Sequence, residues 1–191
     1  MIIEIIDGIK YRLDENKLTA EVWQMMGYKG DIIIPETIVF NEATYRVTSI
    51  GYEAFKGCSS LTSITIPDSV TSIGRAAFDE CSSLTSIIIP NSVTSIGMRA
   101  FSCCDSLESI TIPASVTSIG YQAFYGCDSL TKVIIPASVT SIEEEAFYYC
   151  DELRTIRYGG TIAQWKEIAH SCSVISCRTR VVRCTDGNAK L

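Results

Sequence analysis

A motif of 23 residues recurs five times along the chain and constrains the fold more than any other feature. Its copies open with Val-Thr-Ser-Ile at Val47, Val70, Val93, Val116 and Val139. Each copy continues with an Ala-Phe pair, a cysteine, a leucine and a short β-branched segment. A fixed period of this length predicts a solenoid, in which each copy is one coil stacked on the previous coil. Since one coil cannot bury its own apolar face, the stack must supply the core.

The apolar positions of the motif form columns that we expect to point inward, because a column is buried continuously only where each side chain meets its own copy in the next coil. One column consists of cysteine. A disulfide framework or metal site is the usual interpretation of nine cysteines in a short chain, but a buried thiol also packs as a small hydrophobe. We expect such packing for the five cysteines of the column, Cys58, Cys81, Cys104, Cys127 and Cys150, and more exposure for Cys103, which lies off it.

The residue types within one copy of the motif predict the local structure of a coil. Residues 63–67, Ser-Ile-Thr-Ile-Pro, alternate polar and apolar side chains and predict a short strand that ends at the proline. The Val-Thr-Ser-Ile segment predicts a second strand, and Gly74 after it is interpreted as allowing a sharp change of direction. Phe78, Cys81 and Leu84 recur every third residue, which predicts a turn of helix or 3₁₀-helix with one face inward.

The ends of the chain depart from the motif and predict caps, so the expected organisation is one continuous domain. Residues 1–46 form the N-terminal cap, residues 47–161 the five repeats, and residues 162–191 a C-terminal cap of helix and strand. In the first cap, residues 10–23 and 37–47 predict hairpins, and residues 31–37 a divergent first coil.

The C-terminal cap carries a helix signal. Thr161 and Gln164 have the spacing of a capping box, and Ile162, Trp165, Ile168 and Ala169 would then share the face that covers the last coil. Residues 179–184 predict a strand, followed by a turn at residues 185–188.

The motif resembles a known repeat family. Leu61-x-x-Ile64-x-Ile66-x-x-Ser69 is similar to the leucine-rich repeat pattern L-x-x-L-x-L-x-x-N, and the 23-residue form resembles the BspA-like leucine-rich repeats of bacteria and some protists. The resemblance covers residues 47–161. It implies a leucine-rich-repeat solenoid, mainly β with short helical or 3₁₀ turns, wound as a right-handed coil of stacked parallel strands. Serine replaces the usual asparagine, and we expect its hydroxyl to bond to neighbouring backbone.

Charge and composition exclude several classes. The net charge of −6 argues against general nucleic-acid binding, and no stretch is apolar enough to span a membrane. The first residues lack the basic region of a signal peptide. Residues 1–150 carry 9 Lys and Arg against 18 Asp and Glu, whereas residues 151–191 carry 7 against 4. The basic end is interpreted as solvated surface, with a docking patch around Arg178, Arg180 and Arg183 as the alternative.

The sequence predicts no catalytic residue, no metal and no cofactor. It has a single histidine and no nucleophile-elbow, P-loop or dinucleotide motif. His170, Cys172, Cys177 and Cys184 offer four zinc-type ligands, but they lack the Cys-x-x-Cys spacing of such sites. A disulfide among these three cysteines is the favoured alternative if the protein is secreted. The acidic run 143–145 is interpreted as a solvated face.

What remains is a surface. The outward positions of the Ser-Ile-Thr-Ile-Pro strands form two rows, which are the candidate partner-binding residues, because leucine-rich repeat proteins commonly bind through this sheet. Isoleucines in these rows could mark a contact site, although serine, threonine and isoleucine also simply suit strands. The first row is Ser63, Ser86, Ser109, Lys132 and Thr155, and the second is Thr65, Ile88, Thr111, Ile134 and Arg157.

The resemblance implies a non-catalytic, protein-binding repeat module, secreted or on a bacterial surface, of the adhesion type. Its partner would be a protein, such as a host extracellular matrix or cell-surface protein. The alternatives are an intracellular interaction scaffold, favoured by the missing signal peptide and the unpaired cysteine column, and a structural spacer in a longer surface protein. A cytoplasmic location and the oligomeric state stay open.

Overall fold

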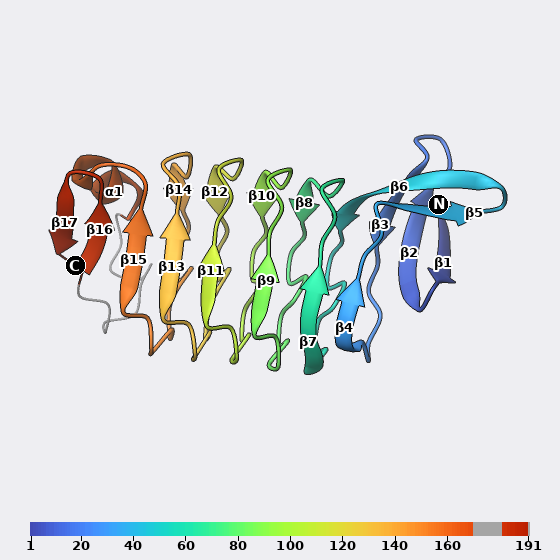
Figure 1. Ribbon diagram of the computed structural model, residues 1–191, viewed down its shortest axis with the longest axis horizontal. Coiled ribbons are helices and arrows are strands. Elements are labelled where there is room, and N and C mark those ends of the chain that lie inside the picture. The colour runs from blue at the N-terminus through green and yellow to red at the C-terminus, as the bar shows by residue number, and fades with distance from the viewer. Residues whose placement is uncertain (170–180, 191) are drawn as a thin grey trace.

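The computed structural model describes residues 1–169 and 181–190 and shows a solenoid of stacked coils with a cap at each end (Figure 1). The predicted fold class is therefore confirmed. The division of the chain at residues 46 and 162 stays a prediction, since the coils and caps pack into one continuous stack.

The front of the solenoid is a layer of parallel strands, as the alternation in each copy predicts. These strands are β7 (Ser60–Thr65), β9 (Ser86–Ile88), β11 (Ser109–Thr111), β13 (Lys132–Ile135) and β15 (Thr155–Tyr158). The cap strands β4 (Lys29–Ile33) and β16 (Val181–Cys184) pair in parallel with β7 and β15. Strand β17 (Gly187–Lys190) closes the layer by pairing antiparallel with β16. The ladder is interrupted between β9 and β11, which divides the layer into sheets of three and five strands.

A second wall contains the Val-Thr-Ser-Ile strands, as predicted. It runs through β8 (Ser72–Ile73), β10 (Ser95–Ile96), β12 (Ser118–Ile119) and β14 (Ser141–Ile142). Toward the N-terminus the same sheet continues into the cap through β6 (Ala43–Ile50).

The third wall differs from the expectation of helix or 3₁₀-helix. Single turns follow one another, as where the amide of Cys81 donates to the carbonyl of Phe78 at 3.2 Å. A continuous helix is excluded because two positions in each coil have positive φ. The alternate amides point along the solenoid axis and donate to the next coil, as Phe78 does to Ala100 at 2.8 Å. The positions with positive φ are Glu53, Ala76, Arg99, Gln122 and Glu145, and Gly57, Glu80, Cys103, Gly126 and Tyr149.

The core consists of the predicted columns. The phenylalanines form one continuous stack from Phe55 to Phe147, with ring centroids 5.1–5.2 Å apart and planes within 7° of parallel. Tyr28 of the N-terminal cap adds a further ring 4.8 Å from Phe55. The five rings lie on one axis because neighbouring coils are stacked in the same register. The even spacing of the rings therefore follows from the regular repeat.

The cysteine column is buried and free of disulfides, as predicted, and each thiol also has a specific partner. The Sγ of Cys104 donates to the carbonyl of Phe78 in the preceding coil at 3.2 Å, and Cys127 does the same to Phe101 at 3.1 Å. Burial raises the pKa of the Cys104 thiol well above its usual value. The Cys104 thiol therefore stays protonated, and the buried thiols of the column pack as small groups with a weak hydrogen bond. Cys103 is half-buried.

The serine column takes over the asparagine role in three coils. The hydroxyls of Ser92, Ser115 and Ser138 each donate to a carbonyl of the preceding coil, at 2.6, 2.5 and 2.9 Å. The buried hydroxyl of Ser69 has no such partner within the described residues. The expected hydroxyl-to-backbone bond is therefore confirmed in those three copies.

The glycine after Val-Thr-Ser-Ile is required for a different reason than the one expected. Gly74 does not have positive φ, but a Cβ there would lie 2.8 Å from the backbone of Gly51 in the preceding coil. The backbones simply approach too closely for a side chain. In the fifth coil Glu143 takes this position, and its carboxylate accepts a hydrogen bond from the amide of Tyr121 at 2.8 Å.

The N-terminal cap is built from hairpins. Strand β2 (Ile9–Asp14) pairs antiparallel with β3 (Thr19–Val22), as predicted, and also with β1 (Ile2–Ile6), which was not expected. Strand β5 (Thr37–Phe40) forms the second predicted hairpin with β6.

The C-terminal cap contains α1 (Ile162–Ile168), whose predicted capping box of Thr161 and Gln164 is present. Trp165 is buried against Tyr158, with ring centroids 5.4 Å apart. Ile162, Ile168 and Ala169 pack on the same core. The described part of residues 179–184 forms β16, and Thr185 and Asp186 turn the chain into β17.

Candidate functional site

The two predicted rows lie on the outer side of the front strands, and we call this surface the front face. In the first row Ser63 is the direct partner of Ser86, and Lys132 lies between Ser109 and Thr155. In the second row Thr65 pairs with Ile88, and Ile134 lies between Thr111 and Arg157. All ten side chains are exposed or half-buried. The expected alignment of these residues on one surface is therefore present, whereas their role in binding is a proposal.

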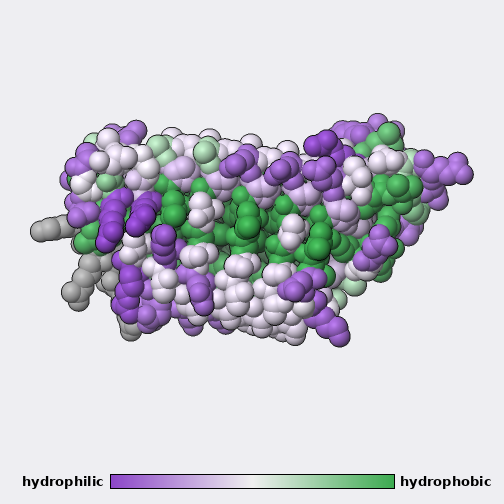
Figure 2. All heavy atoms as spheres, viewed as in Figure 1, coloured by the Kyte–Doolittle hydropathy of each residue, from purple (hydrophilic) through white to green (hydrophobic). Residues whose placement is uncertain are grey.

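Exposed isoleucines interrupt the hydroxyl-bearing side chains of this face. Ile88 is 83% exposed, and Ile33 on β4, which the repeat period did not identify, is 73% exposed and is the strand partner of Thr65. Ile134 is half-buried. Figure 2 shows apolar residues gathered along the middle of this view, with paler and hydrophilic residues on either side. The second row thus offers apolar side chains to a partner at intervals of two strands.

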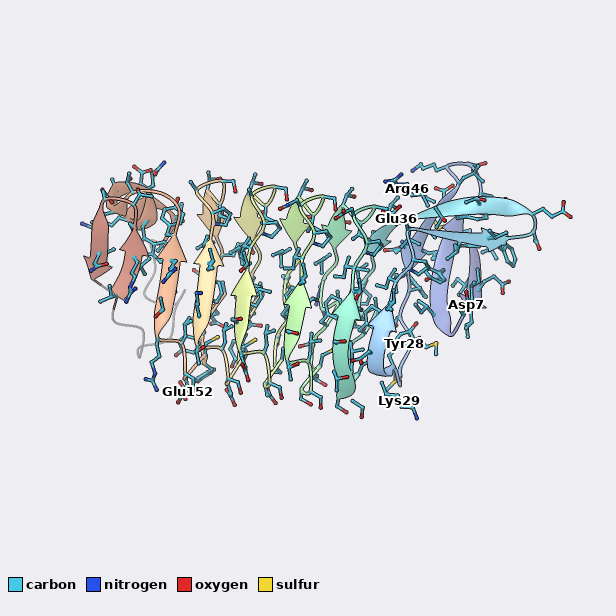
Figure 3. All side chains as sticks on the ribbon, viewed as in Figure 1. Asp7, Tyr28, Lys29, Glu36, Arg46 and Glu152 are labelled. Atoms are coloured by element: carbon cyan, nitrogen blue, oxygen red, sulfur yellow. The ribbon has the colours of Figure 1, made fainter. Side chains whose placement is uncertain are left out.

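The N-terminal end of the front face carries one lysine and one carboxylate, since Lys29 and Asp31 are both exposed on β4. The carboxylate of Asp31 on β4 accepts hydrogen bonds from the hydroxyls of Ser63 at 2.7 Å and Thr62 at 3.0 Å. These two bonds hold the pKa of Asp31 below its usual value, so the group is ionised at neutral pH. Tyr28 and Lys29 lie where the chain enters β4 (Figure 3).

The C-terminal end of the front face is basic. Arg157 on β15 is the direct strand partner of Arg183 on β16, and both are exposed. Lys132 lies two strands before Arg183 in the first row. The nearby acid Glu152 pairs with Arg154 at 2.6 Å and lies before the start of β15, away from the strand (Figure 3).

Other predicted groups have different outcomes. His170, Cys172, Cys177, Arg178 and Arg180 lie outside the described residues. Arg183 is described and lies on the front face. Cys184 is a half-buried free thiol, and residues 1–169 and 181–190 contain no cluster of three potential metal ligands. Within the same residues, no helix has the length and apolar character needed to cross a membrane.

Sequence reasoning missed Asp31, Ile33 and Arg183 as members of the front face. The strand-proline signal of residues 31–37 could have identified Asp31 and Ile33, since it already indicated a stacked coil. Arg183 has no such signal, because it reaches the row only through the pairing of β16 with β15.

Comparison with known proteins agrees with this architecture. Residues 48–175 match the BspA type leucine-rich repeat region, in six copies. A leucine-rich repeat protein of Bacteroides ovatus is 35% identical, with a TM-score of 0.63 over 81% of this chain and 46% of that protein. The leucine-rich repeat protein of T. pallidum is 34% identical, with a TM-score of 0.72 over 78% of this chain and 68% of that protein.

A leucine-rich cell surface protein of Faecalibacterium prausnitzii is 26% identical, with a TM-score of 0.53 over 83% of this chain and 55% of that protein. The chain therefore spans about half the length of two of these three structures. No curated protein matches it. The repeat match covers more than half of the chain and agrees with the stacked coils, so the protein belongs to the BspA type leucine-rich repeat family.

Proposed function

We propose that the protein is a non-catalytic binding module that holds a protein partner on the front face. The observation that carries this proposal is Ile88, whose side chain is 83% exposed on β9, within the front layer of strands. An isoleucine in water contributes nothing to the core, whereas burial against a partner would contribute about 1.5–3 kcal/mol. Flat layers with spaced apolar side chains and hydroxyl groups suit contact with another protein.

The proposed setting is the bacterial surface or the extracellular space, in an adhesion role toward host matrix or cell-surface proteins. Membership of the BspA type family and the likeness to a cell surface protein of Faecalibacterium prausnitzii support it. Protease shaving of intact source cells tests the location. We expect peptides of this protein to be released while a cytoplasmic marker stays intact, and their absence would contradict the surface role.

An intracellular scaffold is the second candidate, because all seven described cysteines are free thiols. Secreted proteins more often pair their cysteines. The shaving experiment separates the two candidates, since an intracellular scaffold would be released only after lysis.

The binding claim is tested on the front face itself. Binding of the chain to a panel of purified extracellular matrix proteins is measured by biolayer interferometry for the wild type, Ile88→Asp and Ile134→Asp. We expect both substitutions to weaken the strongest interaction at least about tenfold, because the loss of one buried isoleucine exceeds 1.4 kcal/mol.

The matched control is Val39→Asp, which changes an apolar side chain of similar exposure, 64%, on β5 of the N-terminal cap. Circular dichroism and urea denaturation confirm that each variant is folded. Equal loss in the control and the front-face variants, or no loss in either, would mean that the front face is not the site.

A further inference from the structure

The charge pattern of the front face indicates the chemistry of its partner, on the basis of the proposed binding function. Arg157 and Arg183 are far apart in sequence, and the repeat period does not relate them. The pairing of β15 with β16 nevertheless makes them direct partners, on strands about 4.8 Å apart. Like charges directly opposite each other destabilise a sheet. The two arginine charges at this end of the face therefore repel each other, and a bound anion would remove this repulsion.

The described residues supply no such anion. Three other arginines have carboxylate partners: Arg12 pairs with Glu21, Arg99 with Asp79 and Arg154 with Glu152. Arg46 and Arg75 form no ion pair within the described residues, but neither of them lies directly opposite another arginine in a sheet. No carboxylate of residues 1–169 or 181–190 forms an ion pair with Arg157, Arg183 or Lys132.

Glu108 is the acid closest in register to this basic cluster. It directly precedes β11 and so lies one position before the partner of Lys132, but it makes no ion pair with that lysine. The net charge of the chain is −6, so three cations that form no ion pair within residues 1–169 and 181–190 make this end of the face opposite in sign to the chain as a whole.

The neighbours of the basic cluster restrict the partner further. Arg157 is the strand partner of Ile134, and Ile88 lies two strands beyond Ile134 in the same row. Ile88 and Arg183 are thus four strand steps apart, roughly 19 Å, a distance that about six residues of an extended segment would span. A sulfated polysaccharide could neutralise the arginines but would leave the isoleucines in water. A protein segment with apolar and acidic side chains satisfies both.

We propose that the front face binds an extended, acidic segment of a partner protein that lies across the strands, with its apolar side chains over Ile88 and Ile134 and its carboxylates over Lys132, Arg157 and Arg183. The three cations set the direction of this segment. The opposite end of the face offers only Lys29 beside the carboxylate of Asp31, so the acidic part is favoured over Lys132, Arg157 and Arg183.

The probe for this proposal is a short fluorescein-labelled peptide with alternating leucines followed by a run of glutamates. Its binding to the whole chain is followed by fluorescence polarisation at low and at physiological salt. We expect the affinity to fall as salt rises, and to fall roughly five- to thirtyfold in the double variant Arg157→Gln/Arg183→Gln, since two exposed ion pairs are lost. The basic control is Lys166→Gln, an exposed lysine on α1 that should leave the affinity unchanged.

Two further probes make the result decisive. A peptide with glutamine in place of glutamate should bind at least about fivefold more weakly, and a heparin oligosaccharide should compete poorly with the glutamate peptide. Equal binding of the two peptides, no binding of the glutamate peptide, or preferred binding of heparin would overturn the proposal. If Ile88→Asp abolishes matrix-protein binding while the arginine variant and the peptides show no charge dependence, the binding function stands and the acidic partner is wrong.

Discussion

The substitution Gly97→Ala tests whether the glycine column exists for conformation or for space. The φ of Gly97 lies outside the left-handed region, so alanine can adopt its backbone without strain. Its Cβ, however, would lie 2.8 Å from the amide nitrogen of Arg75 and from the carbonyl carbon of Gly74. Both are backbone atoms of the preceding coil and cannot swing away as a flexible side chain would.

The magnitude follows from this geometry. Ordinary carbon contacts need several tenths of an ångström more than 2.8 Å, so the two coils must separate locally. The hydrogen bond from the Gly97 amide to the Ile73 carbonyl, now 3.0 Å, then lengthens. Overpacking of this kind costs about 1–3 kcal/mol, and a weakened hydrogen bond costs about 1 kcal/mol. Alanine also lowers the conformational entropy of the unfolded chain relative to glycine, which offsets up to about 1 kcal/mol of this loss. The net loss should be about 2 kcal/mol.

Urea denaturation followed by far-UV circular dichroism measures this loss, and a thermal scan should show a midpoint about 4–8 °C lower. The matched control is Glu143→Ala, in the same column of the fifth coil, where a side chain is already accommodated. It removes only the exposed bond to the Tyr121 amide, so its cost should stay below about 1 kcal/mol. A free energy of unfolding for Gly97→Ala within about 0.5 kcal/mol of the wild type would refute the steric explanation.

Two further predictions concern buried polar groups. Ser115→Ala should lower the free energy of unfolding by about 1 kcal/mol, because it removes the hydrogen bond to the Val93 carbonyl. Ser69→Ala should be neutral or stabilising, because that buried hydroxyl has no partner in the described residues. Equal urea midpoints for the two variants would contradict this expectation. Stability should also fall as pH rises from about 9 to 12. Burial raises the pKa of the Cys81 thiol from 9.0 to about 12, so above pH 9 the unfolded chain releases a proton that the folded protein keeps. The free energy of unfolding should therefore fall by about 1.4 kcal/mol per pH unit in this range. Urea midpoints that do not change between pH 8.5 and 10.5 would show that the thiols contribute nothing.

The repeat period predicted the parts of the fold that depend on stacking. A column can be read directly from the sequence, so the inward phenylalanines, cysteines and strand residues followed from the motif. The third wall did not, because positive φ at Glu53 or Ala76 leaves no mark in residue type. The chain adopts it there because each alternate amide gains a bond to the next coil. Strand β1 was missed although Asp7-Gly8, the turn that joins it to β2, is a recognisable hairpin signal.

The candidate site could be predicted from the repeat period where its residues lie in the repeats, but not where they lie in the caps. Ile88 and Lys132 occupy repeat columns, so their outward position followed from the period. Ile33 and Arg183 belong to the caps, where no period fixes the register. Only the pairing of β4 with β7 and of β16 with β15 brings them into the rows.

The alternate amides of the third wall all donate in one direction, toward the C-terminal coil. This gives the third wall a donor end and an acceptor end, so the two caps meet different backbone groups in this wall. The first cap must supply N–H groups, as Met25 does to the carbonyl of Ala54 at 3.3 Å, and the last must supply carbonyls. A further 23-residue coil could therefore be inserted between any two neighbours without changing either cap. Exchanging the caps would place donor against donor in the third wall, so the number of coils can change while the order of the caps cannot.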